Sequence, residues 1–196
     1  MKKRLSLLLA LMMMLGLLAS CNDEPGQSSA GSSVSVGSTA SLFVGHFDPT
    51  MYFSAECSTS ATYLCYDQLF SIGTDGKWYS DILESWEWDD LTLVLKLKDS
   101  IYFSNGDQMT ASDVLYSIRR FSQSPRGGSN FTYTDLDNSY VSDDDMTLYL
   151  VYTQPYGPYL SGLNVFIVNE SFIEEDMGGD DNIDWYSPDS ICGSGP

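Results

Sequence analysis

Positively charged side chains are scarce in this 196-residue chain. It contains 9 Lys and Arg residues against 27 Asp and Glu residues, which gives a formal net charge of −18. Three of the nine stand at the very beginning, as Lys2, Lys3 and Arg4. Binding to nucleic acid depends on basic patches that neutralise phosphates. The shortage of basic residues therefore excludes nucleic acid as a partner, and an acidic surface is typical of a soluble domain outside the cytoplasm.

Histidine occurs only once, at His46, and the usual catalytic and nucleotide-binding motifs are missing. The sequence has no G-x-x-x-x-G-K-[ST], no H-E-x-x-H and no G-x-S-x-G. A Ser-His-Asp arrangement around His46 is expected by chance in a chain so rich in acids. A secreted enzyme would need a nucleophile beside a base. We therefore predict no catalytic residues, no enzyme activity and no cofactor.

Cysteine is also rare, and its spacing does not indicate a metal site. The four residues are Cys21, Cys57, Cys65 and Cys192, and none belongs to a C-x-x-C pair. If Cys21 is modified, three thiols remain, an odd number that cannot form a complete set of disulfides. Small buried thiols are the favoured interpretation of these three.

The acidic clusters do not have the spacing of a calcium loop. They lie at residues 143–145, 174–176 and 180–181, and none has the ligand pattern and glycine of an EF-hand. Solvated acidic turns are the favoured interpretation, and no metal ligand is predicted.

Long hydrophobic runs are limited to one, at residues 5–18. It follows the basic residues Lys2 to Arg4, precedes Leu18-Ala19-Ser20-Cys21, and is shorter than the ~20 residues that span a bilayer. This pattern predicts an exported protein with a cleaved signal peptide rather than a transmembrane anchor. The Leu-Ala-Ser-Cys ending resembles a bacterial lipobox, which implies removal of residues 1–20, diacylglycerol on Cys21 and attachment to the outside of the cell membrane.

The remaining chain divides into a tether and a domain. Residues 21–41 are rich in Gly, Ser and Ala and lack apolar periodicity, which predicts a flexible tether. Residues 42–196 contain the aromatic and apolar residues of a folded domain, beginning with a short strand at Leu42–Gly45.

Two hairpins are predicted from alternating apolar residues. Leu91, Leu93, Leu95 and Leu97 fall on one face of a strand that follows a turn at Asp89-Asp90. A second hairpin turns at residues 143–145 and continues with alternating residues at 148–152. The continuous apolar run at 165–168 predicts a strand buried on both faces.

Two helices are predicted between these strands. One places Ala61, Cys65 and Leu69 at every fourth position. The other begins after Thr110, with Asp113 completing a capping box, and buries a stripe of Val114, Leu115, Ile118 and Phe121. Gly127-Gly128 is predicted to be a mobile connection. Helices interleaved with hairpins indicate a mixed α/β lobe.

The ordered motifs of this region resemble the N-terminal lobe of the family 5 extracellular solute-binding proteins. The family pattern has a "Y-E-x-L" element, then "D-G" and "L-A-x-S-W", an alternating strand, "V-x-F-x-D-G" and "T-A-x-D-V-x-x-S-x-x-R". The matching residues are Tyr66-Asp67-Gln68-Leu69, Asp75-Gly76, Asp81 to Trp86, Ile101 to Gly106, Thr110 to Val114, Ser117 and Arg120. Asp67, Ser80 and Asn105 depart from the residues that the family usually has.

The resemblance implies a fold and a domain organisation. The fold is α/β, a periplasmic-binding-protein-like (type II) N-terminal lobe with a mixed sheet, hairpins and flanking helices. Residues 191–196 are similar to the family's "V-G-T-G-P-Y" junction, which precedes the second lobe. The expectation is therefore an incomplete solute-binding domain over 42–196, truncated before its second lobe.

The resemblance also implies a function. Such receptors capture a solute outside the membrane and deliver it to the permease of an ATP-binding-cassette importer, and a peptide is the expected ligand. Nickel, haem or an oligosaccharide stay open, as does a structural or adhesive surface lipoprotein, which would show repeats or low-complexity stalks. The loop Ser54, Ala55, Glu56 and Cys57 is the predicted ligand contact, since the family's N-terminal lobe faces the cleft there.

Overall fold

The computed structural model describes residues 46–50, 62–125 and 127–195, all of which belong to one unit, 38–196. The predicted signal peptide, Cys21, the tether and the Leu42–Gly45 strand lie outside the described residues. The same holds for the predicted ligand loop, residues 54–57. The domain boundaries therefore stay predictions.

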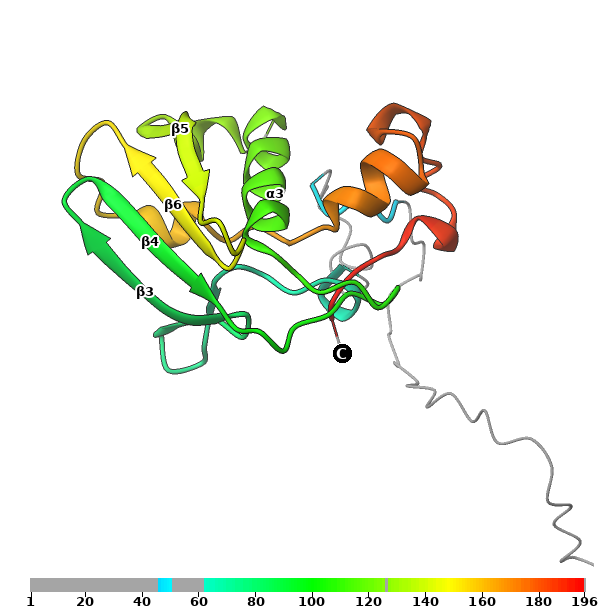
Figure 1. The fold of residues 1–196 in the computed structure, drawn as a ribbon, viewed down its shortest axis with the longest axis horizontal. Coiled ribbons are helices and arrows are strands. Elements are labelled where there is room, and N and C mark those ends of the chain that lie inside the picture. Colours follow the sequence, from blue (N-terminus) through cyan, green and yellow to red (C-terminus); the bar gives the residue numbers. More distant parts are fainter. Residues whose placement is uncertain (1–45, 51–61, 126, 196) are drawn as a thin grey trace, which may run out of the picture. The chain divides into compact units, whose positions relative to one another are not determined.

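A four-stranded antiparallel sheet with the order β3-β4-β6-β5 is the main sheet of the described region (Figure 1). Its two hairpins are those predicted from the sequence. The four strands are β3 (Leu83–Asp89), β4 (Thr92–Leu97), β5 (Thr134–Val141) and β6 (Thr147–Tyr152), and a separate two-stranded sheet pairs β1 (Ser71–Ile72) with β2 (Trp78–Tyr79).

The predicted register of β4 is confirmed. Leu93, Leu95 and Leu97 are buried, whereas Lys96 is exposed on the other face. Leu91 lies in the turn before the strand and is half-buried. Because side chains alternate between the two faces of a strand, a shift of one residue would expose every one of these leucines.

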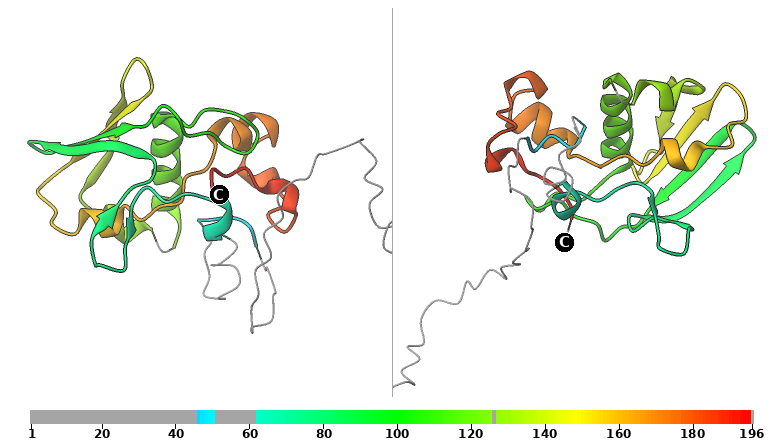
Figure 2. Two further views of the ribbon diagram at one scale, coloured as in Figure 1. Left: turned by 90° about the horizontal axis from the view of Figure 1, so that it is seen from below. Right: turned by 180° about the vertical axis from the view of Figure 1, so that it is seen from behind.

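Helix α3 (Ala111–Gln123) covers the leucine face of the sheet (Figure 2). Its predicted capping box is present, since the Asp113 carboxylate accepts from the Thr110 backbone N–H at 2.8 Å and the Thr110 hydroxyl accepts from the Asp113 N–H at 3.4 Å. Val114 and Ile118 are fully buried against the strands. The amphipathic stripe read from the sequence is therefore the face that packs on the sheet.

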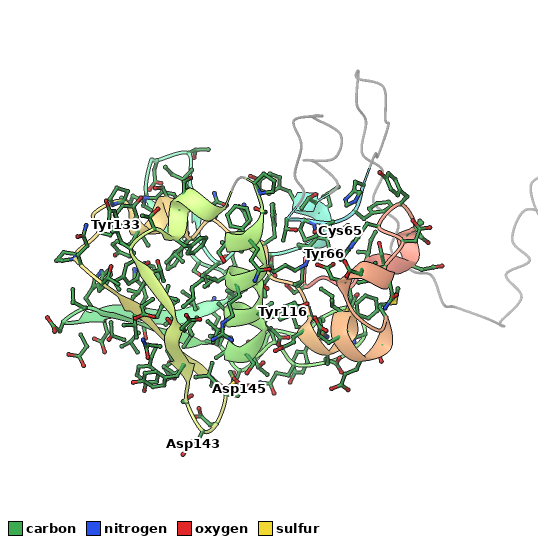
Figure 3. All side chains as sticks on the ribbon, turned by 90° about the horizontal axis from the view of Figure 1, so that it is seen from above. Cys65, Tyr66, Tyr116, Tyr133, Asp143 and Asp145 are labelled. Carbon is green, nitrogen blue, oxygen red and sulfur yellow. The ribbon has the colours of Figure 1, made fainter. Side chains whose placement is uncertain are left out.

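The turn of the second hairpin contributes to the start of α3, which corrects the interpretation of its acids as merely solvated. The Asp145 carboxylate accepts hydrogen bonds from the Ser112 backbone N–H and hydroxyl, both at 2.9 Å. Figure 3 shows Asp145 beside the helix and Asp143 at the outer end of the turn. An acidic group near the first turn stabilises the exposed N–H groups and the positive end of the helix dipole.

The helix predicted around Ala61, Cys65 and Leu69 is wrong beyond its first turn. Residues 62–65 form one helical turn, after which the chain becomes extended and Gln68 pairs with Phe166 in an antiparallel bridge. Two backbone hydrogen bonds flank this bridge, from the Leu69 N–H to Val165 and from the Ile167 N–H to Asp67. Leu69 is buried because of this pairing across the sequence, which local periodicity does not detect.

The segment 165–168 is buried on both faces as predicted, although its ladder is reduced to that single bridge. Val165 and Ile167 pack in the core beneath the sheet, whereas Phe166 and Val168 pack in a second, smaller core. The second core also contains Tyr66, Ile173, Ile183 and Trp185. Because side chains alternate in direction along this extended segment, it contributes residues to both cores and connects them.

Short helical turns complete the described chain. They are η1 (Gly128–Phe131), α4 (Tyr159–Gly162), the π-turn η2 (Phe172–Asp176), η3 (Asp180–Asn182) and η4 (Pro188–Ser190). Gly127 lies in a buried turn after α3, and a Cβ atom there would stand 1.9 Å from the Phe121 carbonyl oxygen. This glycine therefore permits a close backbone approach, which differs from the mobile connection predicted. Among the described residues, no helix has the length and apolarity required to cross a membrane.

Candidate ligand-binding site

A half-open cavity of about 310 Å³ is lined by residues that stand on both sides of the range 51–61 in the sequence, and the predicted ligand loop falls within that range. Thr50 directly precedes that segment in the sequence, and Tyr63 follows it by two residues. Several parts of the chain converge on the cavity, which we call the candidate cavity. Its lining consists of Pro49, Thr50, Tyr63, Gln68, Phe121, Asn130, Ser161, Asn164, Val165 and Phe166.

The lining of the candidate cavity is neutral and combines amides with aromatic rings. None of its described lining residues is an Asp, Glu, Lys, Arg or His. Gln68, Asn130 and Asn164 supply both donors and acceptors of hydrogen bonds. The described walls therefore suit an uncharged polar group better than a formal charge.

An amide pair forms one side of the cavity. The Gln68 side-chain N–H donates to the Asn164 side-chain oxygen, and the backbones of residues 67–69 and 165–167 are joined by the bridge described above. This contact leaves the Gln68 oxygen as an acceptor and the Asn164 amino group as a donor. An acceptor next to a donor is complementary to a peptide group, which carries one N–H and one C=O.

Aromatic rings form another part of the wall. The rings of Tyr63 and Phe166 meet edge to face, with centroids 5.1 Å apart and planes at 73°. Phe166 is buried, whereas Tyr63 is 47% exposed, so the outer ring is accessible from solvent. Edge-to-face pairs hold rings in a defined orientation. Tyr63 is therefore a preformed apolar surface at the mouth of the cavity.

Arg120 fixes the position of Pro49 and Thr50 beside the cavity. Its Nη1 and Nη2 atoms donate to the two Asp48 carboxylate oxygens at 2.6 and 2.9 Å, and Nη1 also donates to the Thr50 hydroxyl at 2.8 Å. The Asp180 carboxylate accepts hydrogen bonds from Nε and Nη2 of Arg120 at 2.8 and 2.7 Å. The guanidinium also lies 5.0 Å from the centre of the Trp185 ring. Two distant segments, 46–50 and 180–185, are thus tied to α3 by one side chain.

The Arg120 cluster is structural and does not provide a free cation for a ligand. A guanidinium has five N–H groups, and the five hydrogen bonds above use all of them. Burial alone would lower the pKa of Arg120, but the hydrogen bonds and charges of Asp180 and Asp48 more than offset this and raise it. A ligand carboxylate would have to displace an aspartate to reach this side chain.

The T-A-x-D-V-x-x-S-x-x-R motif acquires a physical explanation from these contacts. Asp113, Ser117 and Arg120 share one face of α3 and bind, in turn, the N–H of Glu170, the N–H of Val168 and the 46–50 segment. Burial raises the pKa of Asp113, while the hydrogen bonds from Glu170 and Thr110 act in the opposite direction. The motif residues therefore position the backbone that carries the cavity walls, and they do not line the cavity themselves.

Asp180 and His46 also take part in these contacts. Asp180, predicted to be a solvated acid, is an ion-pair partner of Arg120. The His46 ring packs against Trp185 and Tyr186, and its Nδ1 atom accepts a hydrogen bond from the Asp48 backbone N–H at 3.2 Å. Within the described ranges, no group of three His, Cys, Asp or Glu residues is arranged to hold a metal ion.

The two cysteines in the described part of the chain are free thiols. Cys192 is buried and Cys65 is half-buried, and burial raises the pKa of both. Because the thiolate is the reactive form, a raised pKa makes these thiols poor nucleophiles. Gly193 and Gly195 pack directly on the backbone of Cys65, where a Cβ atom would collide. The described part of the junction motif, through Gly193 and Gly195, thus contacts the helical turn beside the cavity.

The predicted site residues themselves are not among the described ones. Cys21 and the loop Ser54, Ala55, Glu56 and Cys57 lie in the undescribed ranges. Sequence reasoning missed the amides Gln68, Asn130 and Asn164, which occur singly in unrelated segments. It also missed the pairing of Asp48 with Arg120, 72 residues apart. A motif for the cavity is absent because its lining comes from short pieces of several elements.

The chain belongs to family 5 of the bacterial extracellular solute-binding proteins. The family profile, described as the middle part of these proteins, matches residues 77–196, which is more than half of the chain. Members of this family are binding proteins and not enzymes. No curated protein sequence matches the chain.

Solved structures share the fold at low sequence identity. OppA from Listeria monocytogenes bound to peptide is 20% identical, with a TM-score of 0.64 over 77% of this chain and 33% of that protein. AppA from Bacillus subtilis in complex with a nonapeptide is 20% identical, with a TM-score of 0.63 over 76% and 30%. NikZ from Campylobacter jejuni with Ni(L-His) is 19% identical, with a TM-score of 0.61 over 78% and 30%. The chain thus spans about a third of the length of these proteins.

Proposed function

We propose that the protein is the ligand-capturing lipoprotein of an ATP-binding-cassette importer, and that it takes up peptides. The neutral candidate cavity, with its Gln68–Asn164 pair, is the observation that carries this proposal. An extended peptide needs partners for its backbone N–H and C=O groups whatever its side chains are. Amides and aromatic rings supply such contacts without selecting a charge. The related OppA and AppA structures, which contain peptides, support the same class of ligand.

In this proposal the cavity forms one wall of the ligand site. The matched part of this chain covers 33% of OppA and 30% of AppA, so in this proposal a second lobe supplies the opposite wall. Closure of two lobes around a ligand is a population shift that is driven by contacts with both. The segment Ser54–Cys57 would contact the ligand from its place between Thr50 and Tyr63. The closed receptor would then deliver the peptide to a membrane permease.

Replacement of Gln68 tests the cavity. Gln68→Leu removes the amide pair and should weaken peptide binding about tenfold, which corresponds to roughly 1.4 kcal/mol for lost hydrogen bonds. Gln123→Leu, at the exposed end of α3, is the matched control and should bind like the wild type. Calorimetry with the complete receptor, using peptides identified by mass spectrometry of the released ligand, provides the measurement.

The same assay distinguishes the alternatives. Bulky residues in place of Ser54 and Glu56 should also weaken binding, and unchanged affinity would remove that loop from the ligand site. Equal affinities of the Gln68→Leu and Gln123→Leu variants would contradict the cavity assignment. Release of nickel, haem or an oligosaccharide instead of peptides would replace the proposed ligand class while leaving the receptor function intact.

Lipid attachment is the proposed mode of anchoring. Cys21→Ala removes the only acyl acceptor that the lipobox defines, so the variant should move from the membrane fraction to the soluble or secreted fraction. Cys65→Ala serves as the control, because that thiol lies inside the folded unit, and it should stay with the membrane. Equal membrane retention of both variants, measured by fractionation and immunoblotting, would show that Cys21 carries no anchor.

A further inference from the structure

A second cavity, of about 300 Å³, lies between the β3–β4 turn and the loop that follows β6. We call it the aromatic pocket. Its lining consists of Trp88, Asp90, Pro155, Tyr156, Gly157 and Tyr159, none of which lines the candidate cavity. Tyr133, which contacts Tyr156, lies well away from Cys65 and Tyr66 in Figure 3. The aromatic pocket is therefore a separate feature of the molecule.

The rings of the aromatic pocket point in different directions. Trp88 meets Tyr159 edge to face at 4.9 Å with planes at 80°, and it meets Tyr152 at 5.0 Å with planes at 60°. The Tyr156 ring packs against the Tyr133 ring, with the ring centroids 5.4 Å apart. Trp88 is 37% exposed, so a ligand can reach its ring. Rings fixed at such angles form adjoining walls of negative π-surface rather than one flat platform.

Asp90 adds the one carboxylate that the described residues bring to the lining of the aromatic pocket. It is exposed at the turn with φ = 53°, a left-handed conformation that Asp adopts more readily than most residues. Among the described residues, the ion pairs of Asp and Glu side chains involve Asp48, Asp75, Glu84 and Asp180, and Asp90 has none. No lysine or arginine of the described ranges lines the pocket. Its electrostatic character is therefore negative.

The chemistry of this lining selects one class of ligand. A sugar or a peptide backbone needs several convergent hydrogen-bond partners, whereas the aromatic pocket offers mainly ring faces and one carboxylate. A quaternary ammonium group donates no hydrogen bonds and is attracted both by ring faces and by a nearby anion. We propose that the aromatic pocket binds a quaternary ammonium group of the choline type, with Trp88, Tyr156 and Tyr159 as walls and Asp90 as the counter-ion.

The charge and shape of the ligand can be tested separately with the full chain. Choline should bind and shift the NMR signals of Trp88 and of the tyrosines in the pocket. Its neutral tert-butyl analogue has the same shape without the charge, and it should bind at least about tenfold more weakly because cation–π attraction is lost. Phosphatidylcholine vesicles, compared with free choline, distinguish a lipid headgroup from a free solute as the source of the group.

Matched variants locate the site. Asp90→Asn keeps the size and the turn conformation but removes the charge, and it should weaken choline binding several-fold. Asp137→Asn, at an exposed position of β5, is the control and should not change choline binding. Tyr156→Leu should reduce affinity about tenfold, whereas Tyr156→Phe retains the ring and should bind nearly as well as the wild type. Tyr186→Leu, at an exposed tyrosine outside the pocket, is the control for loss of a ring.

Several outcomes would overturn this assignment. They are the absence of any shift with choline at tens of millimolar, equal binding of the neutral analogue, and equal or tighter binding of lysine, whose primary ammonium is strongly hydrated. Undiminished affinity in both Asp90→Asn and Tyr156→Leu would place the choline elsewhere. Since none of these measurements involves peptide, the result is independent of the proposed import function.

Discussion

Arg120→Ala is expected to lower the free energy of unfolding by about 3–5 kcal/mol, because it leaves Asp48 buried without its partner. The Arg120 and Asp48 side chains are 9% and 5% exposed, so solvent cannot replace the lost contacts. The variant also releases the Thr50 hydroxyl and the Trp185 ring from α3. Chemical denaturation followed by circular dichroism measures the change.

Three comparisons sharpen this prediction. Arg119→Ala removes an exposed neighbour on the same helix and should change stability by less than about 1 kcal/mol. Asp48→Asn should cost more than Asp180→Asn, since the Asp180 side chain is 42% exposed and can be solvated. Arg120→Lys should not restore stability, because an ammonium group has three donors and cannot replace the five hydrogen bonds that the guanidinium makes. Equal midpoints for the Arg120→Ala and Arg119→Ala variants would disprove the structural role.

Leu93→Asp is expected to destabilise the fold by several kcal/mol. Leu93 is fully buried between β3 and β6, beneath α3, and no described basic residue lies in that core. A carboxylate there would lose its hydration without gaining a partner. Leu93→Ala tests the packing alone and should cost about 2–5 kcal/mol through the cavity that it leaves.

Lys96→Ala provides the control on the opposite face of the same strand. It removes an exposed ion pair with Glu84, and such solvent-screened pairs contribute little to stability. Denaturation midpoints of the three variants should therefore fall in the order Lys96→Ala, Leu93→Ala, Leu93→Asp, from the most to the least stable. A Leu93→Asp variant as stable as Lys96→Ala would mean that the register of β4 is wrong.

Local sequence patterns were sufficient to predict the elements that depend on residues close together in the sequence. The alternating leucines of β4 and the capping box at Thr110 and Asp113 predicted a strand, its buried face and a helix start, and the structure has all three. Side-chain alternation has a period of two residues in a strand, and a cap depends on residues three apart, so neighbours in sequence carry the information.

The helix predicted through Leu69 failed for the opposite reason. Its apolar spacing is compatible with a helix, but the backbone groups of residues 67 and 69 bond to residues 167 and 165 instead. Burial of Leu69 was foreseeable, whereas the partner that buries it was not. Backbone pairing between segments almost a hundred residues apart competes with local helix propensity. The pairing is the more stable arrangement here because the two paired segments are packed between the two cores.

The sequence by itself determined the hairpins, the capped helix and, through the order of its motifs, the solute-binding family. Only the tertiary structure decided how the single residues Asp48, Arg120 and Asp180 combine, and which amides and rings meet in the candidate cavity. Motifs report backbone conformations that recur along a chain. A ligand site is made from side chains that different segments bring together, so its composition is fixed by packing between segments and by the ion pairs that hold them.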